Sequence, residues 1–150
     1  MTARTYTTRR SAIIHAIVNC LKQINGTGDF VSNLSGNIHP KVVFIESITD
    51  FPTVCVIASG ETRTYQAGGY KDRFMTVKVI LFVNEENPLT KLDAIMEDIE
   101  TLLEINAQLP YEDRRGSPQK TLDITVNSIS TDEGAFEPIA IGEMNLTVRY

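Results

Sequence analysis

The stretch from Leu122 to Tyr150 constrains the fold of this chain most strongly. Apolar residues occupy every second position from Met144 to Tyr150, and polar or charged residues fill the alternate positions from Glu143 to Arg149. A period of two residues is typical of a strand that packs one face on a core and turns the other to water or to a partner. An earlier run that starts at Leu122 has the same period. The stretch therefore predicts a C-terminal β-hairpin.

The first of these two runs contains a break in its alternation. Leu122, Ile124 and Val126 share one face, but the next large apolar residue is Ile129, one position out of phase. An extra residue of this kind in one strand forms a β-bulge, which re-aims the side chains beyond it. We therefore predict a bulge near residues 127–128.

The segment that links the two runs is long for a hairpin. It holds about twelve residues, whereas hairpin loops usually have about two to five. Its glycine and proline suit a turn, and its acidic residues favour water. A long loop of this composition is a candidate contact surface, in which we single out Thr131, Asp132, Glu133, Gly134, Phe136 and Pro138.

Two helices and several further strands precede the hairpin. A sustained apolar stripe predicts a helix from about Thr8 to Asn25, and Asn87-Pro88 predicts the start of a second helix with Asn87 as its cap. Other patterns predict strands over Thr53–Ile57, Glu61–Tyr65 and Arg73–Val83, a short strand over Val42–Ile45, and a loop over Tyr111–Lys120.

This order of elements predicts an α+β domain. We expect a mainly antiparallel or mixed β-sheet with both helices packed on one face, ending in the C-terminal hairpin with its long loop. Residues 1–150 are expected to form a single domain, with residues 1–8 as an extended N-terminal arm.

Charge and composition exclude several classes of function. The net charge is −5, and residues 85–104 hold seven acidic residues against a single lysine. Bare nucleic acid is an unsuitable ligand for such a surface, because phosphate binding needs Lys and Arg. The longest mainly apolar run, residues 77–83, is too short to cross a bilayer. His15 and Asn19 interrupt the apolar stretch that follows the first arginines, which argues against a signal peptide and for a cytoplasmic product.

The sequence offers little material for catalysis. Enzymes need a nucleophile beside a base, paired carboxylates or a metal cluster, and this chain has two histidines and two cysteines. Cys20 and Cys55 lie within apolar patterns, so we expect two buried thiols rather than a disulfide or a metal site. We expect no enzyme activity, no cofactor and no metal.

Two further features are candidate contact surfaces. A glycine-containing loop between two strands carries tyrosines and basic residues, which are favoured at protein interfaces; an ordinary solvated hairpin loop is the alternative. On the second helix, four acidic residues form a stripe beside the apolar one, which is either a solvated face or a surface that repels DNA. The loop candidates are Arg63, Tyr65, Gly68, Gly69, Tyr70, Lys71 and Arg73, and the stripe is Asp93, Glu97, Glu100 and Glu104.

Several phrases of the sequence resemble a known family. They are Ser128–Gly134 (SISTDEG), Ile141–Tyr150 (IGEMNLTVRY), Asn33–Asn37 (NLSGN), Phe51–Val54 (FPTV) and Gly60–Thr62 (GET). In order and extent they resemble the tail terminator proteins of bacteriophages with long, flexible tails, and the resemblance covers most of the chain.

This resemblance implies a structural virion protein. Such a protein forms a homohexameric ring that caps the tail tube, stops its polymerisation and presents a docking surface to the head connector. The expected partners are further copies of the chain, the tail tube protein and the connector or neck protein, with transient, non-specific passage of DNA and no membrane. The expected location is the head-proximal end of the tail, after assembly in the host cytoplasm.

The lining of the ring's lumen has two candidates. The acidic helical stripe would repel DNA, and the polar strand face over Glu143–Arg149 is the alternative. For the function itself, the alternatives are another neck or tail-completion protein, and a small α+β enzyme or ligand-binding domain with a deep pocket.

Overall fold

A computed structural model describes residues 7–34 and 36–150 of the chain. Its centre is a five-stranded sheet in the order β1-β2-β3-β7-β6, with a separate two-stranded sheet formed by β4 and β5. The pairing of β1 with β2 is parallel and the other pairings are antiparallel, so the sheet is mixed but mainly antiparallel. The five strands of the main sheet are β1 (Ile38–His39), β2 (Thr53–Tyr65), β3 (Lys71–Asn84), β7 (Ile139–Arg149) and β6 (Asp123–Thr131).

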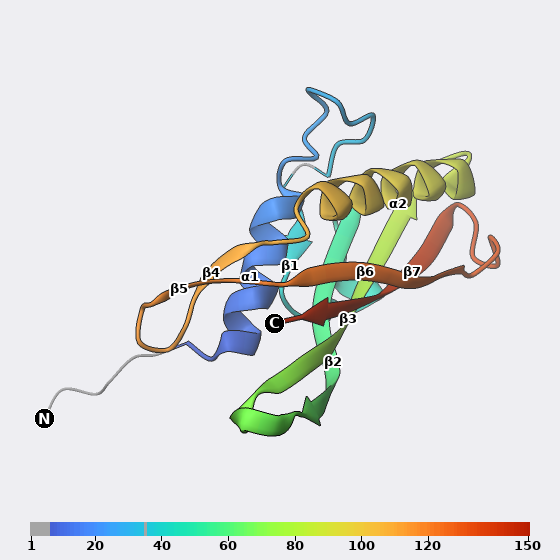
Figure 1. The fold of residues 1–150 in the computed structure, drawn as a ribbon. Coiled ribbons are helices and arrows are strands. Elements are labelled where there is room, and N and C mark those ends of the chain that lie inside the picture. Colours follow the sequence, from blue (N-terminus) through green and yellow to red (C-terminus); the bar gives the residue numbers. More distant parts are fainter. Residues whose placement is uncertain (1–6, 35) are drawn as a thin grey trace, which may run out of the picture.

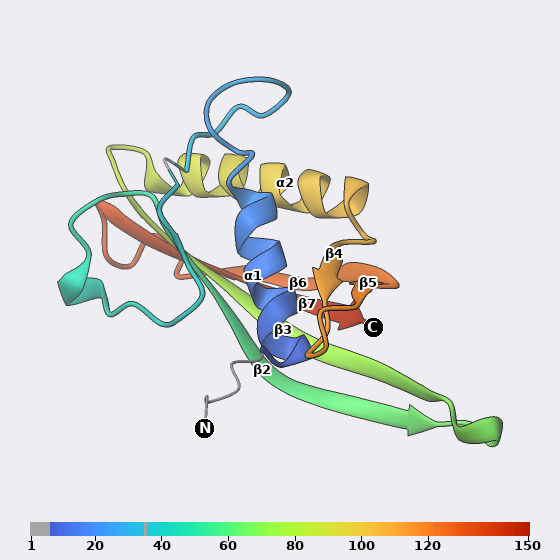
Figure 2. The same cartoon turned by 90° about the vertical axis from the view of Figure 1, so that its left-hand side faces the viewer.

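Two helices cover one face of this sheet (Figures 1 and 2). Helix α1 (Arg9–Leu21) lies near β2, and α2 (Pro88–Ile105) lies across β3, β7 and β6. Each helix directs an apolar stripe at the sheet, which is how an amphipathic helix becomes stable in a folded protein. The predicted α+β architecture with both helices on one face is therefore confirmed.

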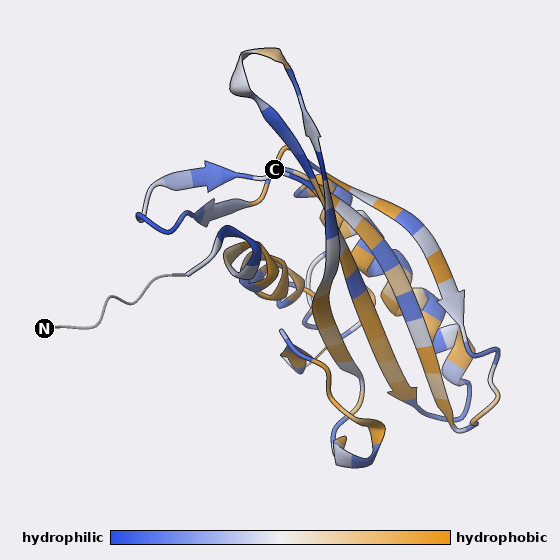
Figure 3. Ribbon diagram, turned by 90° about the horizontal axis from the view of Figure 1, so that it is seen from below, coloured by the Kyte–Doolittle hydropathy of each residue, from blue (hydrophilic) through white to orange (hydrophobic). Residues whose placement is uncertain are grey.

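The core lies between the helices and the sheet. On β3 the alternate residues Met75, Val77, Val79 and Leu81 are fully buried, and the corresponding face of β7 is buried from Ala140 to Val148. The opposite face of β3 is not covered by a helix, and its residues Phe74, Lys78 and Ile80 are half-buried. Figure 3 shows the resulting alternation of hydrophobic and hydrophilic residues along β6 and β7.

The predicted bulge in β6 is confirmed. The register of β6 against β7 shifts between Val126 and Ser128, so that Ile129 pairs with Met144. Because Met144 lies on the helix-covered face, the shift returns Ile129 to the face of Val126. The linking loop is shorter than predicted, since the strands extend inward to leave only residues 132–138 between them.

Several predicted elements were wrong. Residues 42–45 form no strand; the segment instead leads into a short 3₁₀ helix, Ile45–Ser47. The short strand that precedes β2 in the chain and pairs with its outer edge is β1. The predicted loop over residues 111–120 contains β4 (Pro110–Glu112) and β5 (Pro118–Lys120). These strands are too short to show a period in the sequence.

The helix boundaries also differ in detail. Helix α1 ends at Leu21, four residues before the predicted stop, and Thr8 caps it by accepting a hydrogen bond from the Ser11 N–H. Asn87 precedes α2 as predicted, but its side chain makes no capping hydrogen bond. Of the predicted arm, residues 1–6 lie outside the described residues.

Candidate functional site

The β2–β3 hairpin projects from the body of the domain and carries one predicted contact surface at its tip (Figure 2). Gly68 and Gly69 both adopt φ of +82°, a conformation that L side chains rarely accept, so glycine is required for this turn. Tyr65 and Tyr70 are 69% and 75% exposed, and Lys71 lies 5.6 Å from the centre of the Tyr65 ring. The tip therefore presents aromatic and cationic side chains on a defined backbone.

A buried carboxylate anchors the base of the hairpin. Glu61 accepts hydrogen bonds from the Tyr150 hydroxyl and, at 2.6 Å, from the Arg63 Nε, while the Arg10 Nε lies 3.8 Å away. Burial alone would raise the pKa of Glu61, but the hydrogen bonds from Tyr150 and Arg63 outweigh it, so this pKa lies below its ordinary value. Burial and the Glu61 carboxylate raise the pKa of Tyr150 to about 12.

Arginines gather around Tyr150. They line a hollow of about 630 Å³ together with Thr8, Asp113 and Tyr150 itself. The Arg9 guanidinium lies 6.0 Å and the Arg73 guanidinium 5.5 Å from the centre of the Tyr150 ring. We call this hollow the arginine pocket; its arginines are Arg9, Arg10, Arg63, Arg73, Arg114 and Arg115.

Four separate segments supply these arginines. They are the first turn of α1, the end of β2, the start of β3 and the β4–β5 turn. Asp113 shapes that turn, because one oxygen of its carboxylate accepts the backbone N–H groups of Arg115 and Ser117. These hydrogen bonds hold the pKa of Asp113 below its ordinary value.

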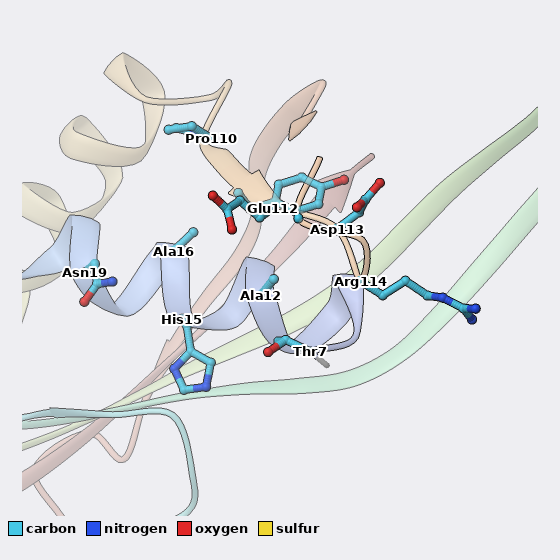
Figure 4. A pocket seen from close by; sticks show the side chains of 11 residues that line it. Thr7, Ala12, His15, Ala16, Asn19, Pro110, Glu112, Asp113 and Arg114 are labelled. Carbon is cyan, nitrogen blue, oxygen red and sulfur yellow. The ribbon is translucent and has the colours of Figure 1, made fainter. Parts of the chain in front are cut away.

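A shallow groove of about 570 Å³ runs beside the arginine pocket, between α1 and the β4–β5 hairpin. Figure 4 shows that Arg114 extends away from this groove, and that the His15 imidazole points away from Glu112. Glu112 therefore does not orient the His15 imidazole in the way that the acid of a catalytic triad orients its histidine. Among the described residues, no three His, Cys, Asp or Glu side chains gather closely enough to bind a metal ion.

The second predicted contact surface, the loop 132–138, lies at the other end of β7 (Figures 1 and 2). Phe136 is 64% exposed, and Glu133 adopts φ of +58°, which is unusual for a residue other than glycine. The loop is ordered by its own contacts, such as the hydrogen bond from the Gly134 N–H to the Asp132 carboxylate at 3.2 Å. We call this segment the acidic loop, after Asp132, Glu133 and Glu137.

The acidic stripe lies on the outer side of α2. Asp93, Glu97 and Glu104 are exposed and Glu100 is half-buried. The open face of the sheet, by contrast, has paired charges: Lys78 lies 3.3 Å from Glu143, and Arg149 lies 2.6 Å from Asp72. The two predicted candidates for a lumen lining thus differ in charge, one acidic and one balanced.

Sequence reasoning found part of these surfaces. It singled out Arg63 and Arg73 beside the hairpin tip, but not Glu61, Tyr150 or the other four arginines of the pocket. The basic N-terminal stretch and the clustered charge of residues 111–120 were visible in the sequence. Nothing local shows that these segments meet, because their contact depends on the order of the strands.

The fold and these surfaces define a class of protein. The chain is an α+β protein whose notable side chains, among the described residues, lie on the projecting hairpin, in the acidic loop and around the arginine pocket. Similarity to known proteins identifies the family: residues 7–150 match the family model described as bacteriophage tail tube terminator protein. The chain is also 31% identical to the tail tube terminator protein p142 of Escherichia phage T5 over 149 residues, which cover 94% of this chain and 92% of that protein.

A solved structure shares the fold. A chain from the virion of a native gene transfer agent particle superposes with a TM-score of 0.58 at 9% sequence identity, covering 93% of this chain and 95% of that chain. The protein belongs to the bacteriophage tail tube terminator family. It is a structural protein rather than an enzyme, and the resemblance seen in the sequence is confirmed. None of the helices among the described residues is long and apolar enough to span a membrane.

Proposed function

We propose that this protein assembles into a homohexameric ring that caps the tail tube, stops its polymerisation and provides the docking surface for the head connector. The observation that carries this proposal, beyond family membership, is the projecting β2–β3 hairpin with Tyr65 and Tyr70 exposed at its tip. A terminator needs one surface that matches the tube subunit and another that does not, so that growth ends. An aromatic hairpin tip suits the first of these surfaces, because exposed tyrosines are strong anchors at protein interfaces.

The ring would sit at the head-proximal end of the virion tail after assembly in the host cytoplasm. Its partners would be the tail tube protein on one side and the connector or neck protein on the other. The acidic loop, including Thr131 and Pro138 at its borders, is the candidate for contact between neighbouring copies or along the axis of the ring. The residues of the hairpin, from Arg63 to Arg73, are the candidates for contact with the tube.

We propose that the acidic stripe of α2 lines the lumen. DNA that passes through the ring must not adhere to it, and carboxylates repel phosphates. The charge-balanced open face of the sheet, with its Lys78–Glu143 pair, would attract DNA less than a basic surface but would not repel it. The stripe is therefore the better lining.

The first experiment measures the mass of the purified protein by light scattering and images it by negative stain, alone and with tail tubes. Rings of about six subunits on one end of each tube are the expected result. The variant Y65S/Y70S should form the same rings without capping tubes. As a matched control, V42S/F44S removes two exposed apolar side chains elsewhere and should cap normally. A monomer that ignores tube ends would refute the proposal.

The lumen assignment has its own test. The double reversal E97K/E104K should leave rings intact but make them retain duplex DNA at low salt, with retention falling steeply as salt rises. The control E46K/D29K makes the same change in charge at exposed positions outside α2. Equal retention by both variants would place the stripe outside the lumen.

A further inference from the structure

The arginine pocket concentrates positive charge in an acidic protein. It brings together six arginines, with Asp113 in its lining and Glu61 at its edge, although the chain as a whole has a net charge of −5. Arg9 and Arg10 occupy the first turn of α1, which contains no acidic residue. The positive end of the helix dipole lies there, so cations at these positions oppose helix stability.

Two more features of the arginine pocket act against folding. Arg63 and Arg73 are directly paired across β2 and β3, and like charges in that relation destabilise a sheet. The Arg9 Nε is buried without a hydrogen-bond partner, which also has a free-energy cost. A ligand that brings negative charge into the pocket would offset these three unfavourable contributions to folding.

The acidic loop has the complementary properties. It offers the carboxylates of Asp132, Glu133 and Glu137 around the exposed Phe136. Asp132 keeps one oxygen buried without a partner, and Glu133 is held in the left-handed region of φ. Residues other than glycine adopt this conformation only at a cost in free energy, so the shape of this loop does not serve its own stability.

The acidic loop and the arginine pocket lie at opposite ends of one strand. The loop immediately precedes β7, and Tyr150 of the pocket immediately follows it. Eleven residues of β7, at about 3.3 Å each, separate the two by roughly 35 Å. They cannot meet within one chain, but they can meet between two copies arranged head to tail.

We propose that the arginine pocket of one copy receives the acidic loop of the next copy. Guanidinium groups bind carboxylates through paired, charge-assisted hydrogen bonds, and Phe136 would pack beside the Tyr150 ring and the guanidinium faces. A contact between two different patches is heterologous, and it closes into a ring when the rotation between copies permits. This contact rests on the proposed ring and identifies the surfaces that join its subunits.

The test uses two variants that each destroy one side of the contact. The pocket variant R73E/R115E should lose rings because its two new carboxylates cancel the positive charge of the pocket and repel those of the loop, while its fold remains stable because the Arg63–Arg73 repulsion is gone. The loop variant E133R/E137R should lose rings because its loop repels the pocket. Like-charge contacts of this kind should raise the concentration needed for assembly at least about 100-fold.

Mixing the two variants makes the test specific. The pocket variant retains a normal loop that fits the normal pocket of the loop variant, and the arginines of the reversed loop face the carboxylates of the reversed pocket. The mixture should therefore assemble, as measured by analytical ultracentrifugation, at concentrations where each variant alone stays monomeric. The controls K22E/K41E and E46R/D29R make matched changes at exposed positions and should assemble as the wild type does.

Several outcomes would overturn this contact. Rings formed by either variant alone, or a mixture that stays monomeric, would exclude it. If the wild type binds duplex DNA and the pocket variant forms rings that do not, the arginines are assigned to phosphate instead. If the wild type forms no rings, the proposed function has failed; titration of a peptide of residues 129–141 onto the monomer then tests the contact separately, and binding that the pocket variant lacks would support it.

Discussion

Strands β2 and β3 are a core element at one end and an exposed arm at the other. Within the body, Val54 and Val56 pair with Leu81 and Val79, and all four are fully buried beneath the helices. Beyond Gly60 β2 is mostly exposed and its partner residues 72–74 on β3 are half-buried, and Figure 3 shows the change from hydrophobic to hydrophilic residues along the two strands. The two halves of this hairpin therefore differ in role. The buried apolar half stabilises the fold, and the charged and aromatic half presents side chains to other proteins.

A bulge separates the two halves. The register of β2 against β3 shifts between Ala58 and Gly60, so that Glu61 pairs with Met75. Met75 lies on the helix-covered face, so the shift turns Glu61 and Arg63 toward α1 and Tyr150. The arginine pocket therefore depends on this one extra residue in β2.

We expect the largest loss of stability from a substitution in the buried half of the hairpin. Leu81→Ala should lower the free energy of unfolding by about 2–5 kcal/mol, because it removes a fully buried side chain and leaves a cavity. Urea denaturation with an unchanged m value measures this loss. Ile80→Ala changes the neighbouring, half-buried residue on the open face and should cost less. Equal losses would show that the open face is packed as tightly as the core.

We expect the next largest loss of stability from a substitution where the buried and the projecting halves of the hairpin meet. Glu61→Gln should cost about 1–2 kcal/mol at pH 7, because it removes the charge that Arg63 and Tyr150 stabilise. The pKa of Glu61 is lowered in the folded protein, so its contribution is present above the ordinary value of 4.5 and is lost as pH falls through the folded value. The difference between variant and wild type should therefore narrow in acid, as followed by thermal unfolding from pH 7 to pH 3. A difference independent of pH would assign the effect to shape rather than charge.

A smaller effect is expected where the arm meets β7. Arg149→Gln breaks the 2.6 Å pair with Asp72 on a partly exposed surface, and such pairs contribute little to stability. The Arg149 hydrogen bond holds the pKa of Asp72 below its ordinary value. The loss should shrink in about 1 M salt, where charges are screened over about 3 Å. A loss that persists at high salt would point to the packing of Arg149 on the Phe74 ring.

The smallest effect on stability is expected at the tip. Y65S/Y70S removes two exposed rings and should change the free energy of unfolding by less than about 0.5 kcal/mol. The same variant should lose tube capping. Normal stability together with lost capping would show that the tip serves contact with the tube and not folding. A large loss of stability would mean that the tip supports the fold and would weaken its assignment as a contact surface.

Local patterns in the sequence predicted the framework of the fold. The two-residue period of residues 143–150 predicted β7, the phase slip predicted the bulge near residue 127, and the stripes predicted both helices with their shared face. These features were readable because each depends on neighbours a few positions apart, where side-chain direction follows the backbone period.

Other features were decided only by the tertiary structure. The parallel pairing of β1, the β4–β5 hairpin and the bulge of β2 leave no period in the sequence, because the segments involved are two or three residues long or deviate by one residue. The arginine pocket is the clearest case. The sequence determined that these arginines exist, but only the folded chain places Arg9, Arg73 and Arg115 around Tyr150, because contacts between distant segments follow from strand order and register rather than from local spacing.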